Sequence, residues 1–305
     1  MKSRLLILTG CLLSILLLLP ACKSSGVGTS QKSIVVTYSI LGSVVKELVG
    51  NQANVIVSIP NGLDPHEWEP SAKDIEAINK ANLVIQNGLG LEGGRQKTLS
   101  LAQGSGVKFF TASDYITVRH VGPGEGIPSS DPDQATGAAD PHLWTDPLAM
   151  KDVVAALAGY LKTNLDINVD AQSQDLQARL DNLNTQVAAE VSVLPQDSRK
   201  LVTGHESMGY FAQRYGFKLI GAVIPSLSDQ ADVSAADLAA LKQEIMDNNV
   251  KDIFAEQGTS PAIVNQIGAE TGARVVELST HILPSDGSYF TFETELAATI
   301  VNALK

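Results

Sequence analysis

The feature that most constrains the fold is an alternation of short apolar runs with longer amphipathic stretches, which starts at Lys32 and continues to the end of the chain. Strands separated by helical stretches of this length are typical of parallel sheets with crossover helices. We therefore expect an α/β fold. The apolar runs are rich in β-branched residues and predict strands over residues 33–39, 54–60, 82–88, 107–113, 200–205, 218–224, 250–258 and 273–279.

The amphipathic stretches carry apolar residues at helical spacing. They predict helices over residues 40–50, 71–81, 94–104, 147–165, 170–194, 206–216, 234–249, 261–272 and 292–304. Ser71 and Ser234 stand where an N-cap is needed, and Gly50 stands where the first helix must end. At ~1.5 Å per residue the longest of these helices would reach ~37 Å, which suits a rigid connector.

A chain of 305 residues has the length of about two domains. We expect two lobes, each with a mainly parallel sheet flanked by helices, at residues 32–165 and 196–305. The long helix at residues 170–194 would join them. Residues 118–140 differ from the rest because they are rich in Gly, Pro, Ser and Asp and show no apolar period. Loops of this length are usually functional or disordered, and we predict that this one is mobile.

The first residues resemble a secretory signal. A basic start, MKSR, precedes an apolar run that ends in LPAC. We predict a lipoprotein signal peptide over residues 1–22, lipid attachment at Cys22, and a flexible tether over residues 23–31. Cys11 is the less favoured attachment point because few apolar residues precede it. The alternative is a membrane anchor at residues 5–21, which has about 17 residues, the lower limit for a spanning helix.

The composition describes an acidic globular protein. Hydrophobic residues make up 44% of the chain, which is ample for sizeable cores. The net charge is −11, and removal of Lys2 and Arg4 with the signal leaves 20 basic residues against 33 acidic residues. Such a surface repels nucleic acid and anionic lipid, so we expect no nucleic-acid partner. The predicted mature chain has no cysteine beyond the lipidated one, and its stability must come from packing.

Three of the five histidines share one place in the predicted topology. His66, His205 and His281 follow predicted strands, and ligands of α/β folds bind outside the carboxyl ends of strands. His142 closes the loop in AADPHLWTDP, a near copy of the segment GLDPHEWEPSAKD around His66. Imidazole nitrogens suit zinc, copper, nickel or iron. The shared placement predicts a metal site, although any single histidine would equally fit a cap or a surface position.

Acidic and aromatic residues flank these histidines. A metal-bound histidine usually passes its second N–H to a carboxylate or carbonyl, which makes Asp64, Asp140 and Asp146 candidate outer partners. Asp64 and Asp140 precede proline, and an Asp-Pro pair that merely starts a turn is an equally good interpretation. The rings of Trp68 and Trp144 could shelter a site from water, but we expect them to be packing residues.

Four motifs at matching spacing resemble a known family: GLDPHEWEPSAKDI, ANLVIQNGLGLE, DPHLWTDP and VTGHESMGYFAQRYGF. Over nearly the whole predicted mature chain, the sequence is similar to the zinc- and manganese-binding lipoproteins that feed ABC importers, the cluster A-I metal solute-binding proteins. The resemblance implies two α/β lobes joined by a long helix, with one metal ion at the lobe interface.

The resemblance also implies a set of metal ligands. By position, His66, His142 and His205 match the family's first three ligands. Manganese members commonly carry glutamate at the third position and zinc members carry histidine, so His205 implies Zn²⁺ rather than Mn²⁺. The family's fourth ligand is usually an acid in the turn after the last strand of the C-terminal lobe.

The fourth ligand and the loop are where this chain departs from the family pattern. The segment ELSTHILPSDGSYF offers His281 at the best-aligned place, with Glu277 and Asp286 as alternatives. Zinc members often carry a loop near the site that is rich in histidine and acidic residues. His120, in the loop at residues 118–140, is a candidate accessory ligand of this kind, and the alternative is an ordinary solvated residue.

The resemblance implies a high-affinity extracytoplasmic receptor, held at the cell membrane by a lipid anchor, that captures Zn²⁺ and delivers it to an ABC import permease. We expect a monomer that is not an enzyme. A second hypothesis is a zinc hydrolase or hydratase with a three-histidine site, but a catalytic zinc keeps one position open for water. The sequence carries no nucleophile elbow, HExxH or phosphate loop. A third hypothesis is a surface adhesin or metal buffer.

Overall fold

The computed structural model describes residues 31–67, 69–127 and 131–305. The predicted signal peptide, Cys22 and nearly all of the tether lie outside the described residues, as does Trp68. The same is true of the membrane anchor considered as an alternative to the signal. In the part of the chain that is described, no helix combines the length and the apolar character needed to cross a membrane.

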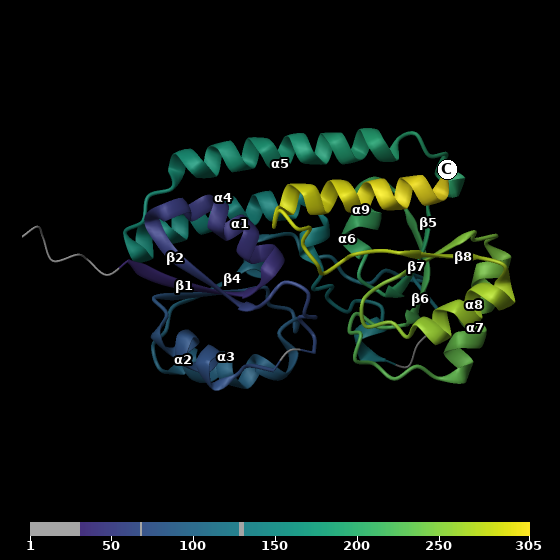
Figure 1. Ribbon diagram of the computed structural model, residues 1–305, viewed down its shortest axis with the longest axis horizontal. Helices are drawn as coiled ribbons and strands as arrows, with labels where there is room; N and C mark the ends of the chain where they lie inside the picture. The colour runs from purple at the N-terminus through teal and green to yellow at the C-terminus, as the bar shows by residue number, and fades with distance from the viewer. Residues whose placement is uncertain (1–30, 68, 128–130) are drawn as a thin grey trace, which may run out of the picture. The chain divides into compact units, whose positions relative to one another are not determined.

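The N-terminal half is built on a four-stranded parallel sheet in the order β2-β1-β3-β4. Its strands are β1 (Lys32–Tyr38), β2 (Ala53–Ile59), β3 (Leu83–Gln86) and β4 (Phe109–Thr111). Its helices are α1 (Ser39–Val49), α2 (Ala72–Lys80), α3 (Gln96–Gly104) and α4 (Pro147–Leu165). Figure 1 shows α1 and α4 above the sheet and α2 and α3 below it. Side chains alternate along β1, so Ile34 and Val36 join the core on one face while Val35 joins the core on the other.

The C-terminal half carries two pairs of parallel strands, β5 with β6 and β7 with β8, and β5 also lies beside β7. The strands are β5 (Lys200–His205), β6 (Lys218–Ile224), β7 (Asp252–Ala255) and β8 (Arg274–Glu277). The helices are α6 (Gly209–Tyr215), α7 (Ala235–Asp247), α8 (Pro261–Thr271) and α9 (Tyr289–Leu304). Figure 1 shows α7 and α8 on one side of these strands and α9 on the other. The chain therefore folds as two α/β halves, as the sequence predicts.

A long helix, α5 (Asp170–Val191), packs against α1, α4 and α9, and Figure 1 shows it running along both halves. Its predicted apolar stripe is confirmed, since Leu176, Leu180, Leu183 and Val187 are all buried. One continuous apolar core joins β1, α4 and α5 to β5, β7 and α9. A wide hinge motion would break this shared core and expose apolar surface to water, which is unfavourable.

Local sequence signals explain where several helices begin and end. Ser71 and Ser234 are the N-caps of α2 and α7, and each hydroxyl accepts a hydrogen bond from a backbone N–H of the first turn. Gly50 ends α1 with a positive φ of 52°.

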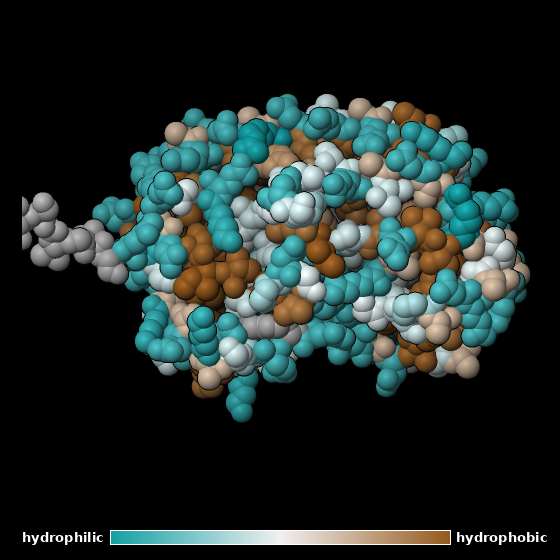
Figure 2. Space-filling view, in the orientation of Figure 1, coloured by the Kyte–Doolittle hydropathy of each residue, from teal (hydrophilic) through white to brown (hydrophobic). Residues whose placement is uncertain are grey.

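Figure 2 shows hydrophilic side chains over most of the face in view, interrupted by separate apolar patches. Short 3-10 helices occupy several connections: Gly50–Gln52, Gly93–Arg95, Ala112–Tyr115, Pro132–Gln134, Leu143–Thr145 and Gln196–Ser198.

The loop at residues 118–140, which its composition predicts to be mobile, is packed in its described part. Arg119 is buried and pairs with the carboxylate of Glu125. Ile127 is also buried, and it lies in the apolar core of the C-terminal half together with Val202 of β5. A few isolated buried side chains, such as Val121 and Ile127, and the ion pairs of Arg119 leave no period in the sequence, so composition alone cannot reveal this packing. The loop ties the two halves together.

Truncation of Ile127 tests the packing of this loop. We expect Ile127→Ala to lower the free energy of unfolding by about 2–4 kcal/mol, because it leaves a cavity in a buried core. Urea unfolding followed by circular dichroism measures the change. Leu101→Ala is the matched control: Leu101 is 64% exposed on α3, and its truncation should change stability by less than about 0.5 kcal/mol. Equal effects of the two substitutions would contradict a packed loop.

Candidate metal centre

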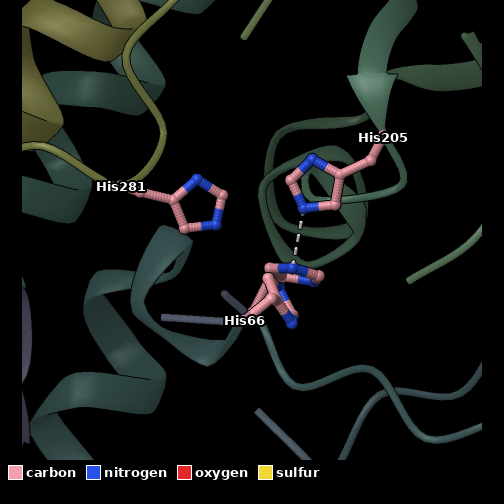
Figure 3. Close-up of side chains that lie close together, drawn as sticks. His66, His205 and His281 are labelled. Carbon is pink, nitrogen blue, oxygen red and sulfur yellow. Dashed lines mark hydrogen bonds between the residues drawn. The ribbon is translucent and has the colours of Figure 1, made fainter. Parts of the chain in front are cut away.

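Four histidines reach one buried space from four different segments. His66 lies in the turn after β2, and His142 lies in the segment that leads into α4. His205 is the last residue of β5, and His281 lies in the loop after β8. Figure 3 shows the rings of His205 and His281 facing His66. The structure thus brings together the four histidines that the sequence singles out.

The ring nitrogens are close enough to share one cation. Each ring offers one nitrogen to the group, and these four nitrogens all lie within 4.8 Å of one another. His142 Nε2 and His205 Nε2 are 3.1 Å apart. His66 Nε2 and His281 Nε2 are buried without a hydrogen-bond partner among the described residues. Four nitrogens bound to one zinc ion at ~2.0–2.1 Å in a tetrahedron stand ~3.4 Å apart, so a small contraction of this group completes a zinc shell.

Two buried carboxylates fix the tautomers of the central pair of rings. His142 Nδ1 is 2.9 Å from Asp140 Oδ1, and His205 Nδ1 is 2.7 Å from Glu256 Oε2. An ionised carboxylate only accepts hydrogen bonds, so each Nδ1 carries a proton and donates it. Each neutral ring then presents a lone pair at Nε2. Two lone pairs facing each other at 3.1 Å repel, and a cation between them removes that repulsion.

A tryptophan and a threonine hold the fourth ring. Thr280 Oγ1 is 2.9 Å from His281 Nδ1. The indole Nε1 of Trp144 donates a 2.8 Å hydrogen bond to the carbonyl of Thr280. The phenol of Tyr289 in turn donates to the carbonyl of Trp144 at 2.8 Å. Trp144 is fully buried, and its ring centroid lies 5.2 Å from that of His142. Trp144 is therefore a packing residue, as expected, and it also positions the segment that carries His281.

Burial keeps three of the imidazoles neutral. Burial, followed by the charges of neighbouring histidines, lowers the pKa of His66 and the pKa of His142 well below the usual value. Burial, followed by the charge of His205, lowers the pKa of His281 to about 4. A histidine binds metal in its neutral form, so these three rings are ready to bind at neutral pH.

The pKa of His205 shifts in the opposite direction from those of the other three rings because Glu256 lies beside it. Burial lowers the pKa of His205, but the charge and the hydrogen bond of Glu256 outweigh burial and leave that pKa raised. Burial raises the pKa of Glu256, and the charge and hydrogen bond of His205 outweigh it in turn and leave that pKa lowered. His205 is consequently the ring of the four that most readily carries a second proton, which a metal ion must displace.

Two glycines in the motif VTGHESMGY leave room for the two carboxylates. A Cβ added at Gly204 would lie 2.9 Å from Glu256 Cβ and 3.0 Å from Glu256 Oε2. A Cβ added at Gly209 would lie 2.2 Å from Asp140 Oδ2. Neither position tolerates a side chain without moving the carboxylate that orients a histidine ring. The glycines of the motif therefore serve the same site as its histidine.

The packed loop is connected to the site through an arginine. Arg119 Nη1 donates a 3.0 Å hydrogen bond to Asp140 Oδ2, and its backbone N–H donates to Tyr210 Oη at 3.0 Å. Burial raises the pKa of Asp140 to about 6, although the charge of Arg119 acts in the opposite direction. At neutral pH Asp140 is therefore ionised and accepts from His142 on one oxygen and from Arg119 on the other.

Three residues considered from the sequence lie outside the histidine group. Glu277 is the last residue of β8 and is exposed. Asp286 is exposed and accepts hydrogen bonds near the start of α9. His120 is exposed in the loop and pairs with Ala139 in an isolated β-bridge. Of the candidates for a fourth ligand, His281 is the one that the structure places beside the other rings.

Of the three acids considered as outer partners, Asp140 contacts a histidine ring, whereas Asp146 and Asp64 have other contacts. Asp146 caps α4 by accepting a 2.9 Å hydrogen bond from the backbone N–H of Leu148, and it pairs with Arg214. Among the described residues no hydrogen bond joins Asp146 to a histidine ring. Asp64 accepts a 2.7 Å hydrogen bond from the backbone N–H of His66. It therefore shapes the Asp-Pro turn, which is the alternative that the sequence left open.

Glu256 and Thr280 are site residues that the sequence analysis missed. Glu256 directly follows β7, so the strand-end rule that drew attention to His66 and His205 applies equally to it. Thr280 carries no comparable signal, because its role depends on which ring its hydroxyl meets in space.

This arrangement defines a two-lobed α/β protein with a buried group of four histidines that could hold a metal ion, and comparison with known proteins agrees. The family model described as zinc-uptake complex component A, periplasmic, matches residues 34–303. The high-affinity zinc uptake system protein ZnuA of Bacillus subtilis (strain 168) is 30% identical over 275 residues, which cover 87% of this chain and 85% of that protein. The manganese-binding lipoprotein MntA of Halalkalibacterium halodurans is 26% identical over 287 residues, which cover 90% and 89%.

A solved structure shows the same architecture. The periplasmic zinc-binding protein TroA from Treponema pallidum matches with a TM-score of 0.75 at 25% sequence identity, and the match covers 90% of this chain and 99% of that one. The chain belongs to the zinc-uptake complex component A family.

The fourth position is tested by two substitutions on the same loop. We expect His281→Ala to weaken zinc binding by at least about 100-fold, since a ligand is lost from a buried shell whose outer partners alone are worth about 10- to 100-fold. Glu277→Ala, at the exposed end of β8, should bind like the parent chain. Competitive titration against a zinc chelator measures both affinities. Loss of binding in Glu277→Ala with full binding in His281→Ala would assign the fourth position to Glu277.

As the pH falls, protonation of His205 should be the first change that weakens zinc affinity. Its pKa is raised, so affinity should start to fall as the pH drops through that raised value, by about tenfold per pH unit for one displaced proton. His281, with a pKa of about 4, should add to the slope only near that pH. Chelator titrations between pH 5 and 8 measure the slope. Glu256→Gln removes the charge that raises the pKa of His205 and should flatten the slope near neutrality, whereas a flat profile in the parent chain would contradict this assignment.

Proposed function

We propose that this chain is an extracytoplasmic receptor that binds one Zn²⁺ ion through His66, His142, His205 and His281 and delivers it to an ABC import permease. The observation that carries the proposal is the convergence of four imidazole nitrogens on one buried space, two of them without any hydrogen-bond partner among the described residues. Relatives named for zinc uptake and zinc binding support zinc as the cargo.

The donor set favours zinc over manganese. Imidazole nitrogens suit Zn²⁺, whereas Mn²⁺ prefers carboxylate, carbonyl and water oxygens. Two buried carboxylates beside the rings, Asp140 and Glu256, face the Nδ1 atoms of histidines and are thereby engaged as outer partners. One relative is named a manganese-binding lipoprotein, so direct competition between the two ions is the informative assay.

A closed shell also supports a receptor over a hydrolytic site. A catalytic zinc retains a position for water or substrate beside three protein ligands. Here His281 stands in that fourth position, and burial lowers its pKa so that its ring is neutral and able to bind. Four protein nitrogens hold a cargo ion without exposing it to water, which is what capture and transfer require.

We propose that the ion binds between two lobes. The N-terminal lobe, residues 32–165, supplies His66 and His142, and the C-terminal lobe, residues 196–305, supplies the other two rings. The segment at residues 170–194 is the connecting helix between them. Because α5 and the continuous core join both halves, capture relies on loop movements and modest lobe shifts.

The signal-like segment at residues 1–22 supports an extracytoplasmic location. We propose that the signal at residues 1–22 is removed and that lipid attached to Cys22 holds a monomer at the outer side of the cell membrane. The family description as periplasmic and the name lipoprotein for a relative support this location. The acidic composition fits a receptor that handles cations and has no nucleic-acid partner.

Metal analysis and competitive zinc titration on the chain without residues 1–22 test the binding function. We expect one zinc ion per chain, and His66→Ala and His205→Ala should each weaken binding by at least about 100-fold. His120→Ala is the matched control, because this histidine is exposed outside the group, and it should bind like the parent. If the two ligand variants retain parental affinity, the proposed site is wrong.

A further inference from the structure

A second group of potential ligands lies beside the four-histidine site and shares one residue with it. Asp64, His66 and Asp229 each offer one atom, and these atoms lie within 4.8 Å of one another. Asp64 belongs to the turn after β2, and Asp229 belongs to the loop between β6 and α7. The group therefore draws on both halves of the fold, as the four histidines do.

The two carboxylates are buried, and one oxygen of each accepts no hydrogen bond from an N–H group of the described residues. Asp64 is 5% exposed and Asp229 is 8% exposed. Asp64 Oδ1 accepts from the backbone N–H of His66, and Asp229 Oδ1 accepts a 3.3 Å hydrogen bond from Gln230 Nε2. Asp64 Oδ2 and Asp229 Oδ2 have no hydrogen-bond partner among the described residues. A buried carboxylate oxygen without a donor is unfavourable unless a cation or a proton satisfies it.

This group lies next to an acidic cavity. A cavity of about 790 Å³ is lined by His66 together with Glu67, Glu69 and Asp133. Gln230, which bonds to Asp229, also lines this cavity and donates a 2.9 Å hydrogen bond to Glu67 Oε1. An acidic lining raises the local concentration of cations. His66 is thus the residue common to the cavity, the carboxylate pair and the four-histidine group.

The placement of the pair also points to a cation. Two carboxylates face each other in a buried place beside His66. A divalent cation neutralises both groups at once and gives each Oδ2 atom a partner.

We propose that Asp64, Asp229 and His66 form a transit site for a divalent cation, through which the ion passes between the acidic cavity and the four-histidine site. The inference rests on the proposed zinc-receptor function. Carboxylate oxygens are the harder donors and imidazole nitrogens suit zinc better, so the ion gains by moving inward. His66 binds it in both positions, and the ion moves inward without first losing all of its protein ligands.

Zinc binding kinetics test this transit site. Suppose that a residue binds the ion during entry and exit but not in the final bound state. Its substitution then changes the association and dissociation rate constants by the same factor, so the dissociation constant stays nearly unchanged. We expect Asp229→Asn to lower both rate constants by about tenfold or more, with a dissociation constant within about threefold of the parent. Stopped-flow fluorescence of the chain follows the rates, because Trp144 packs against His142.

The matched control is Asp232→Asn, which removes the same charge from an exposed position in the same loop. It should leave both rate constants close to those of the parent. Equal slowing by the two variants would show general electrostatic attraction and overturn the transit site. A change in the dissociation rate constant alone, with weaker affinity, would also overturn it, since that pattern indicates a role in the final bound state.

A second substitution separates a shared site from two independent effects. Asp64→Asn keeps an oxygen that can accept from the backbone N–H of His66, so the turn should persist. If both carboxylates bind one cation, the double variant should be about as slow as the slower single variant. Additive slowing would contradict a shared site. The proposed receptor function and the transit site can fail separately. If the parent chain and the variants all bind zinc tightly at equilibrium, the receptor function stands whatever the rate constants are. If the parent chain does not bind zinc, the receptor function is wrong.

Discussion

The structure depends on four imidazole nitrogens that face one another in a buried space. Burial lowers the pKa of three of the rings and favours their neutral form, and the carboxylates of Asp140 and Glu256 turn the lone pairs of their partners inward. Lone pairs that converge without donors destabilise the fold on their own, and a single divalent cation satisfies all of them together. A chain selected only for stability would fill such a space with apolar side chains. In the proposed function, the site is therefore organised for a cation before the cation binds.

The two halves supply this site through the same structural device. Parallel strands end at one edge of each sheet, and the ends of β2, β5 and β8 and the turns after them bring His66, His205 and His281 together. Gly204 and Gly209 let the orienting carboxylates approach, and Arg119 connects one of them to the loop that Ile127 anchors in the opposite half. The long helix and the shared core then restrict how far the halves can separate. Exchange of the ion must use local paths, and the acidic cavity beside His66 is one such path.

Most of the fold could be predicted from the sequence because it depends on the regular spacing of apolar residues along the chain. Apolar runs, helical spacing and the caps at Ser71 and Ser234 are local signals, and the elements they predict are present. The candidate histidines followed from the strand-end rule. What could not be predicted depends on encounters in space: the docking of Ile127 in the other half and the contact of Thr280 with its ring leave no pattern in the sequence. Glu256 directly follows β7, so the same rule applies to it and predicts a site residue there.

Anomalous diffraction at the zinc edge, from crystals of the zinc-loaded chain, tests the central claim most directly. We expect one strong peak at ~2.0–2.1 Å from the Nε2 atom of each of the four histidines, with no water in the shell. The carboxylates of Asp140 and Glu256 should keep their hydrogen bonds to Nδ1 atoms. A peak bound by three histidines and a water molecule, with His281 turned away or replaced by Glu277, would contradict the closed four-nitrogen site.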